Sequence, residues 1–207
     1  MTSKSFYFDG TRCSGCKTCE FACKDYNDTD IGFAYRKNYE ISGGETSRDE
    51  NGVITTSLFA YPISLACNHC AMPACTEVCP TRAMHKDPET GMVVVDSSKC
   101  IGCGYCEMAC PYNAPKVSKA KGHCVKCDGC IARVSAGLKP VCVEACPCQA
   151  LNYVDTSAVA DNGAEVADIF PLPSHKTTVP NLYILSSPDA QKANIDNAIV
   201  ANPAEVH

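Results

Sequence analysis

The 207-residue sequence predicts a loop-rich α+β fold that is held together by something other than a large apolar core. Three observations lead to this prediction. The chain contains 18 cysteines but no tryptophan, and only 7% of its residues are aromatic. The apolar fraction of 45% counts those cysteines, so the remaining apolar residues are few for a chain of this length. The cysteines also recur in four runs of similar spacing, and short segments separate the runs.

Sixteen of the cysteines form the four runs. Each run begins with two cysteines that are separated by two residues and ends with two that are separated by three. The runs are Cys13, Cys16, Cys19 and Cys23; Cys67, Cys70, Cys75 and Cys79; Cys100, Cys103, Cys106 and Cys110; and Cys127, Cys130, Cys142 and Cys146. Runs one and three share a Cys-Glu-x-Ala-Cys ending, and runs two and four share Cys-x-Glu-x-Cys-Pro. An internal duplication is the simplest account of this repeat.

Short elements are expected between the runs. Residues 19–23 and 106–110 are predicted to begin short helices. Residues 34–57 are polar and Gly-rich, and we interpret them as an insertion. Residues 83–95 predict strand, turn and strand, because apolar and β-branched ends flank Asp-Pro-Glu-Thr-Gly. After residue 153 the chain has no cysteine and five prolines, which predicts an extended tail that is either disordered or laid along a partner.

The cysteine runs favour metal over disulfides. A disulfide scaffold implies secretion, yet the first twelve residues contain no apolar signal segment and no two arginines are adjacent. Three cysteines at Cys-x2-Cys-x2-Cys spacing reach three irons of a cubane, and a cysteine three residues later points toward a second cluster. Four runs therefore predict four 4Fe-4S clusters with sixteen ligands. Zinc, which also uses Cys-x2-Cys pairs, is the alternative, but an outward-pointing fourth cysteine disfavours it.

Glycine and proline accompany the runs. A glycine precedes the second cysteine of three runs, where the missing Cβ lets backbone N–H groups approach the inorganic sulfurs (Gly15, Gly102 and Gly129). A proline follows the last cysteine of three runs and turns the chain away (Pro80, Pro111 and Pro147). Run one instead has Lys24 after its last cysteine. Run two has His69 in the glycine position, where it either donates a hydrogen bond to a cluster or simply packs.

Two cysteines lie outside the runs, Cys124 and Cys148, and we expect both to be spare thiols rather than ligands. The net charge of −5 argues against a nucleic-acid partner. Four thiolates around an oxidised cubane would leave about −2 at each site. Seven basic residues close to the cysteines either compensate this charge or are ordinary solvated residues: Arg12, Lys17, Lys24, Lys99, Lys126, Arg133 and Lys139.

Several longer stretches resemble one family. They are Arg-Cys-Ser-Gly-Cys-Lys-Thr-Cys-Glu at 12–20, Ala-Cys-Lys-Asp-Tyr at 22–26, Leu-Ala-Cys-Asn-His-Cys at 65–70, Ala-Met-His-Lys at 83–86, Cys-Ile-Gly-Cys at 100–103, Lys-Cys-Asp-Gly-Cys at 126–130, Pro-Leu-Pro at 171–173 and Ala-Asn-Pro at 201–203. On these residues the chain resembles the iron–sulfur subunit of bacterial anaerobic dimethyl sulfoxide reductases, a four-cluster ferredoxin-like subunit of molybdopterin oxidoreductases. The resemblance covers nearly the whole chain.

This resemblance implies how the runs pair. Run one would pair with run four and run two with run three, in two intertwined bacterial-ferredoxin-like domains that each hold two 4Fe-4S clusters. The outer domain would combine residues 1–33 and 120–155, and the inner domain would be residues 58–119. Residues 34–57 would be the insertion and residues 156–207 the extended C-terminal tail.

The same pairing implies the ligands. They would be Cys13, Cys16, Cys19 and Cys146 for cluster 1; Cys23, Cys127, Cys130 and Cys142 for cluster 2; Cys67, Cys70, Cys75 and Cys110 for cluster 3; and Cys79, Cys100, Cys103 and Cys106 for cluster 4. Some relatives have tryptophan at the position of Cys103 and hold a three-iron cluster there. The cysteine in this chain therefore predicts four 4Fe-4S clusters.

The resemblance also implies the function of an electron-transfer subunit. Electrons would pass from a quinol-oxidising membrane anchor to a molybdopterin catalytic subunit that reduces dimethyl sulfoxide in anaerobic respiration. The chain itself has no dinucleotide fingerprint, no nucleophile elbow and no segment long enough to span a membrane, so we expect no catalytic residue and no span of its own. It would be assembled in the cytoplasm without its own signal and exported with the catalytic subunit to the periplasmic side or the cell surface.

Two other functions remain open at this point. The same relay could serve a thiosulfate, polysulfide or tetrathionate reductase or a formate dehydrogenase. The chain could instead be a regulatory module that is stabilised by zinc or by an iron–sulfur cluster, although its acidic charge and lack of a basic helix speak against that class.

Overall fold

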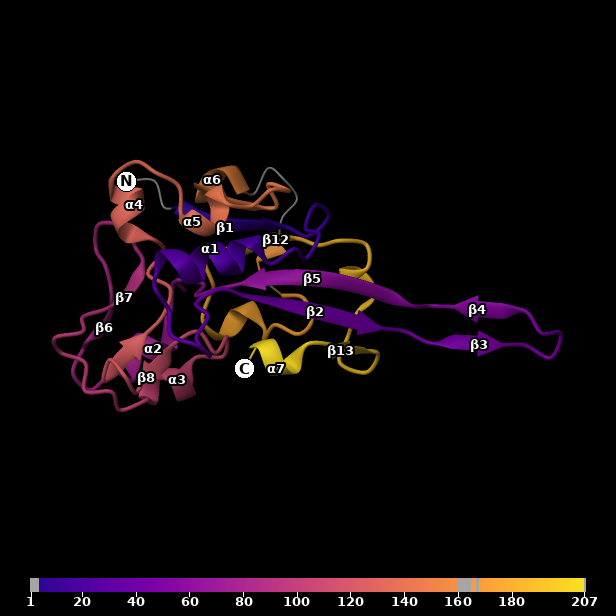
Figure 1. Ribbon diagram of the computed structural model, residues 1–207, viewed down its shortest axis with the longest axis horizontal. Helices are drawn as coiled ribbons and strands as arrows, with labels where there is room; N and C mark the ends of the chain where they lie inside the picture. Colours follow the sequence, from indigo (N-terminus) through magenta and orange to yellow (C-terminus); the bar gives the residue numbers. More distant parts are fainter. Residues whose placement is uncertain (1–3, 160–164, 167, 207) are drawn as a thin grey trace.

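The computed structural model describes residues 4–159, 165–166 and 168–206. The first three residues of the predicted outer domain (1–3) and parts of the predicted tail (160–164, 167 and 207) lie outside these ranges. Short helices and small sheets are joined by many loops, which confirms the mixed α and β composition predicted from the sequence. A body containing most of the elements carries one long two-stranded arm (Figure 1).

A four-stranded sheet combines a strand near the N-terminus with three strands from the C-terminal third of the chain. Its order is β10 (Leu151–Asp155), β1 (Lys4–Asp9), β12 (Leu182–Leu185) and β11 (Glu165–Val166). Strand β1 pairs antiparallel with β10, so that Phe6 lies opposite Tyr153, and parallel with β12, so that Phe6 also lies opposite Leu182. The helix α6 (Thr156–Val159) follows β10 directly.

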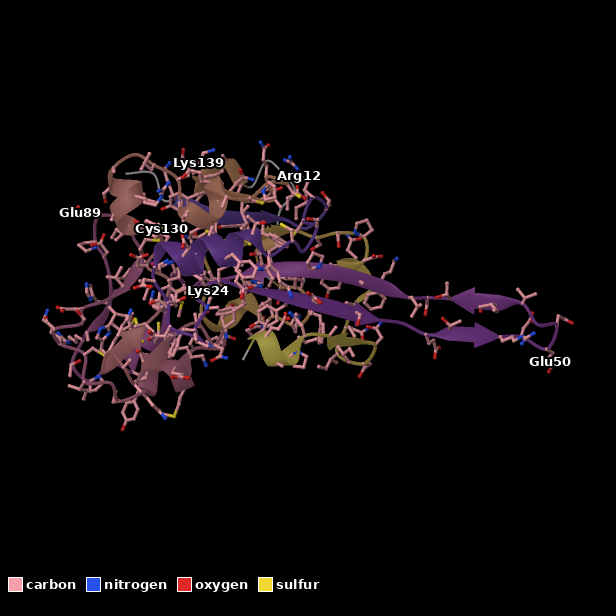
Figure 2. All side chains as sticks on the ribbon, viewed as in Figure 1. Arg12, Lys24, Glu50, Glu89, Cys130 and Lys139 are labelled. Carbon is pink, nitrogen blue, oxygen red and sulfur yellow. The ribbon has the colours of Figure 1, made fainter. Side chains whose placement is uncertain are left out.

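A three-stranded antiparallel sheet continues into the arm. Its order is β13 (Ala198–Val200), β2 (Lys37–Gly43) and β5 (Phe59–Leu65). Beyond it, β3 (Thr46–Arg48) and β4 (Ile54–Thr56) pair with each other and reach far from the body, with Glu50 at the tip (Figures 1 and 2). All residues of β3 and β4 are exposed. The segment interpreted as an insertion therefore contains the arm and also the strand β2.

One apolar cluster joins these two sheets. Phe6 and Phe8 come from β1, Ile41 from β2, Ile63 from β5 and Ile184 from β12, and each is at most 4% exposed. From Phe6 to Asp9 the burial along β1 alternates, as in a strand with one face in the core, and Ser5 is buried as well. Burial of each such side chain contributes about 1.5–3 kcal/mol. This core fixes the framework from which the cysteine loops extend.

The cysteine runs lie on or beside short helices and hairpins, and none of these elements is part of the arm. The predicted strand–turn–strand is confirmed by β6 (Met84–Lys86) and β7 (Val93–Val95), and a second hairpin consists of β8 (Lys116–Ser118) and β9 (His123–Val125). The predicted helices are α1 (Thr18–Tyr26) and α3 (Tyr105–Ala109). Three further short helices are α2 (Ala74–Glu77), α4 (Ile131–Ser135) and α5 (Val141–Glu144). Helix α1 packs against α5, and α2 packs against α3.

The C-terminal region is extended over much of its length, but it pairs with strands of its own chain, which neither alternative for the tail included. Strand β12 joins β1 because Leu182 and Ile184 enter the core, and β13 pairs with β2. The described residues of this region also include two 3₁₀ turns (His175–Thr177 and Ala190–Lys192) and the helix α7 (Pro203–Val206). Helix α7 is held where Lys17 Nζ lies 2.6 Å from Glu205 Oε2.

Candidate metal centre

The four cysteines assigned to cluster 1 line one cavity. Cys13 and Cys16 come from the loop before α1, Cys19 lies in the first turn of α1, and Cys146 follows α5. Cys16 is exposed and Cys19 is buried. The structure thus brings three cysteines of run one together with the last cysteine of run four. The spare thiol Cys148 lines the same cavity.

The four cysteines assigned to cluster 4 line a second cavity. Cys100, Cys103 and Cys106 come from the loop before α3 and from α3 itself, and Cys79 comes from the end of run two. Cys103 is the exposed member, as Cys16 is in the first cavity. The loop turns at Gly102, which has φ +67° and lies so close to Gly122 that an added Cβ would be 2.9 Å from the Gly122 carbonyl oxygen.

The cysteines assigned to cluster 2 gather deeper in the body. Burial raises the pKa of Cys23 to about 12, and the nearby thiolates of Cys142 and Cys130 act in the same direction. Burial also raises the pKa of Cys127 well above its ordinary value, with Cys23 and Cys67 as the main thiolates beside it. Cys127 therefore lies near its own group and also near Cys67, which belongs to the next group.

The cysteines assigned to cluster 3 are also within reach of one another's charge. Burial raises the pKa of Cys75 to about 12, followed by repulsion from Cys67 and Cys110. Burial likewise raises the pKa of Cys70 to about 11, and Cys67 and Cys110 add to the shift. Three cysteines of run two are thus grouped with the last cysteine of run three.

The donor set fits iron–sulfur clusters. In the described part of the chain, no three His, Cys, Asp or Glu side chains converge closely enough to hold a single metal ion. The thiols of the two outer groups instead line cavities, so that four sulfur donors surround a space. Buried thiols with raised pKa values become thiolates when a cation binds them, and binding then releases protons. Thiolate is the ligand that cubane clusters require.

Backbone N–H groups point at several of these sulfurs. Met84 N–H donates to Cys79 Sγ (3.4 Å), and Ala150 N–H donates to Cys146 Sγ (3.3 Å). Cys79 and Cys146 are the last cysteines of runs two and four, and each accepts a backbone hydrogen bond from four or five residues later in the chain. Side-chain donors add to the set, since Asn27 Nδ2 lies 3.5 Å from Cys23 Sγ. Hydrogen bonds to the sulfurs are one of the factors that set a cluster's reduction potential.

Comparison with known proteins identifies the family. The family described as 4Fe-4S dicluster domain matches residues 58–156. The B chain of the anaerobic dimethyl sulfoxide reductase of Haemophilus influenzae is 47% identical over 206 residues, which cover 100% of both chains. The corresponding B chain of Escherichia coli strain K12 is 47% identical over 205 residues, which cover 99% of both chains. The protein belongs to this family of B chains.

A more distant relative carries the role in its name. The thiosulfate reductase electron transfer subunit PhsB of Salmonella typhi is 39% identical over 146 residues, which cover 70% of this chain and 72% of that one. The resemblance seen in the sequence is confirmed, and the chain is an iron–sulfur electron-transfer subunit that is not catalytic alone. Among the residues that the structure describes, no helix has the length and apolarity needed to cross a membrane.

His69 packs in the core, and its ring also faces a cysteine sulfur. Its ring is buried, and Val93 N–H donates to Nδ1 at 3.0 Å. Burial and the nearby Lys126 ammonium lower the pKa of His69 well below its ordinary value, so the ring is neutral and its proton lies on Nε2. Nε2 faces Cys127 Sγ at 3.8 Å, and the ring stacks on Phe6.

The seven basic residues proposed near the cysteines differ in burial. Lys126 is 6% exposed, whereas Arg12, Lys99 and Lys139 are exposed; the last of these lies on the outside of the body (Figure 2). Burial alone would lower the pKa of Lys126, but the thiolates of Cys67 and Cys127 raise it, so the side chain stays charged. The other three, Lys17, Lys24 and Arg133, are half-buried.

Sequence reasoning missed Arg36, which is 3% exposed. Burial alone would lower its pKa, and the thiolates of Cys142 and Cys19 more than offset that effect. Arg36 lies between runs one and two in a polar segment, 13 residues from the nearest cysteine in the sequence. Only its conservation in an alignment or the folded structure could have drawn attention to it.

Proposed function

We propose that the sixteen run cysteines hold four 4Fe-4S clusters in the groups described above, and that the chain relays electrons through them in a line. The clusters would receive electrons from a quinol-oxidising membrane anchor and deliver them to a molybdopterin subunit that reduces dimethyl sulfoxide. The bound clusters would supply one-electron chemistry, while the chain would hold their thiolate ligands and supply hydrogen bonds to the sulfurs.

The observation that carries this proposal is the exchange of last cysteines between runs. Cys146 joins the cavity of run one, and Cys79 joins the cavity of run three. The packing of α1 on α5 and of α2 on α3 supports the same pairing. So does the pairing of β1 with β10 and of β6 with β7, because each joins the strand before one run to the strand after its partner. We propose two interlocked domains on this basis, residues 1–33 with 120–155 and residues 58–119.

The order of the groups supports a linear relay. Groups 1 and 2 are linked through helix α1, which carries both Cys19 and Cys23. Groups 2 and 3 meet where Cys127 lies near Cys67. Groups 3 and 4 share run three. An exposed cysteine in each outer group, Cys16 and Cys103, leaves both ends of the line accessible to partner chains.

The terminal reaction is proposed from the family. The relatives that match over their full length are named as chains of an anaerobic dimethyl sulfoxide reductase. We expect the complex that co-purifies with this chain to oxidise a reduced dye when dimethyl sulfoxide is added. The same assay with thiosulfate and with tetrathionate is the control, since subunits of those reductases are also relatives. Oxidation of the dye by one of these, but not by dimethyl sulfoxide, would contradict the proposed substrate.

A further inference from the structure

Two cations are buried among the cysteine groups. Lys126 is 6% exposed and Arg36 is 3% exposed. A buried ammonium or guanidinium is costly unless a negative charge and hydrogen bonds compensate it. Their partners therefore indicate what these side chains do.

Lys126 lies at the junction of two groups. Its Nζ donates to Cys67 Sγ at 3.5 Å and to the Cys127 carbonyl oxygen at 2.6 Å, and it also contacts the Val93 carbonyl oxygen. Cys67 is assigned to cluster 3 and Cys127 to cluster 2. The side chain thus joins the two proposed domains at the step where an electron would pass from one cluster pair to the other.

The negative charge that compensates the Lys126 ammonium comes from cysteine sulfur. Across the described ranges, its polar contacts are a thiol and two carbonyl groups, and no ion pair with a carboxylate is found. Two loaded sites next to it would each carry about −2. That charge is what a buried, otherwise unpaired ammonium requires.

Arg36 lies among cysteines of groups 1 and 2 and reaches Cys19 through Ser64. Its Nη1 donates to Ser64 O and to Ser64 Oγ, both at 3.1 Å, and Ser64 Oγ lies 3.2 Å from Cys19 Sγ. The guanidinium also lies over the ring of Phe6. Its Nε is buried and has no hydrogen-bond acceptor among the described residues. Arg36 thus has a free donor in a region that contains cysteines of groups 1 and 2.

We infer that Lys126 raises the reduction potentials of clusters 2 and 3, the two inner clusters, so that an electron can cross between the cluster pairs, and that Arg36 raises the reduction potentials of clusters 1 and 2. This inference rests on the proposed function. A reduced cluster carries one more negative charge, so a fixed positive charge favours reduction. The effect is stronger in the interior than at the surface, because neither water nor salt screens the buried charge.

The test compares Lys126→Gln with two controls in the full chain, isolated anaerobically with any chains that co-purify. Lys126→Arg keeps the buried charge, and Lys139→Gln removes an exposed charge from the same stretch. Reduction of each cluster is followed by electron paramagnetic resonance in a redox titration. The variants Cys16→Ser and Cys103→Ser identify the signals of clusters 1 and 4, which are the two outer clusters of the line.

In Lys126→Gln, the ratio of reduced to oxidised inner cluster at a fixed potential should fall about tenfold or more. For a one-electron couple, tenfold corresponds to about 59 mV. The outer clusters should change less, and neither control should change the inner clusters by more than about twofold. Unchanged inner clusters in Lys126→Gln, or an equal fall in Lys126→Arg, would overturn the inference.

If Lys126→Gln does not assemble, a second variant, Arg36→Gln, still tests the inference. Arg36→Gln should make clusters 1 and 2 harder to reduce than in the unaltered chain and should affect clusters 3 and 4 less. An equal shift of all four clusters, or no shift, would contradict a local effect of the buried charge. Iron and sulfide far below sixteen per unaltered chain would instead contradict the proposed function, so the two failures are distinguishable.

Discussion

At the residue scale, Cys124, which the sequence predicts to be a spare thiol, lies very close to a proposed ligand. Cys124 Sγ lies 3.6 Å from Cys106 Sγ in the cavity of group 4, and its own N–H donates to Cys100 Sγ. The contact between the two thiols lowers the pKa of Cys106 to about 7 and raises the pKa of Cys124, because a shared proton favours a single thiolate. Cys124 Sγ also donates to the Val125 carbonyl oxygen at 3.8 Å, so Cys124 is the member of the pair that keeps its proton.

Cys124→Ser should accordingly keep a full set of clusters, because serine still offers an O–H donor at this position. Iron and acid-labile sulfide analysis of the anaerobically isolated variant would give the same content as the unaltered chain. The matched control is Cys106→Ser, which removes an assigned ligand of the same group and should lower the content. Loss of iron in Cys124→Ser comparable to that in Cys106→Ser would show that Cys124 is a ligand.

Individual residues also show which features could be predicted from the sequence and which could not. The spacing of the cysteines predicts iron–sulfur chemistry and which thiols are spare, because ligand geometry is local. The burial of Lys126 and Arg36 depends on segments that are distant in the sequence, since Lys126 contacts Cys67 and Arg36 contacts Ser64. Tertiary contacts of this kind leave no periodic signal in a single sequence.

At the element scale, the elements next to the runs were predictable, and the arm was not. The hairpin of β6 and β7 and the helices α1 and α3 follow local turn and helix signals. The strands β3 and β4 are exposed along their whole length, so they lack the alternation of apolar and polar residues that indicates a strand with one buried face. The pairing of β12 and β13 with β1 and β2 also depends on contacts far apart in the sequence.

The arm contains no cysteine, and its two outer strands make a hairpin that alone is at best marginally stable in water. Replacement of residues 45–57 by an Asn-Gly turn should therefore leave cluster assembly unchanged, because β2 and β5 still pair in the body. The measurement is the iron content and the visible spectrum of the shortened chain. A shortened chain that lost iron would assign the arm a part in the cluster-bearing fold.

At the scale of the whole molecule, a modest apolar core joins the larger sheets, and the cysteine groups bring the remaining segments together. The core joins the two larger sheets through residues such as Phe8 and Ile63. The cysteine groups connect segments that lie more than a hundred residues apart, as Cys13 and Cys146 do. The pairing of runs came from the family resemblance, because cysteine spacing alone allows several pairings.

We propose that the four groups together form a relay of four one-electron centres. Mediated coulometry of the anaerobically isolated chain, taken to full reduction, counts these centres. About four electrons should be taken up per chain, one for each cubane. Uptake of two electrons or fewer, in material with its full content of iron and sulfide, would contradict it.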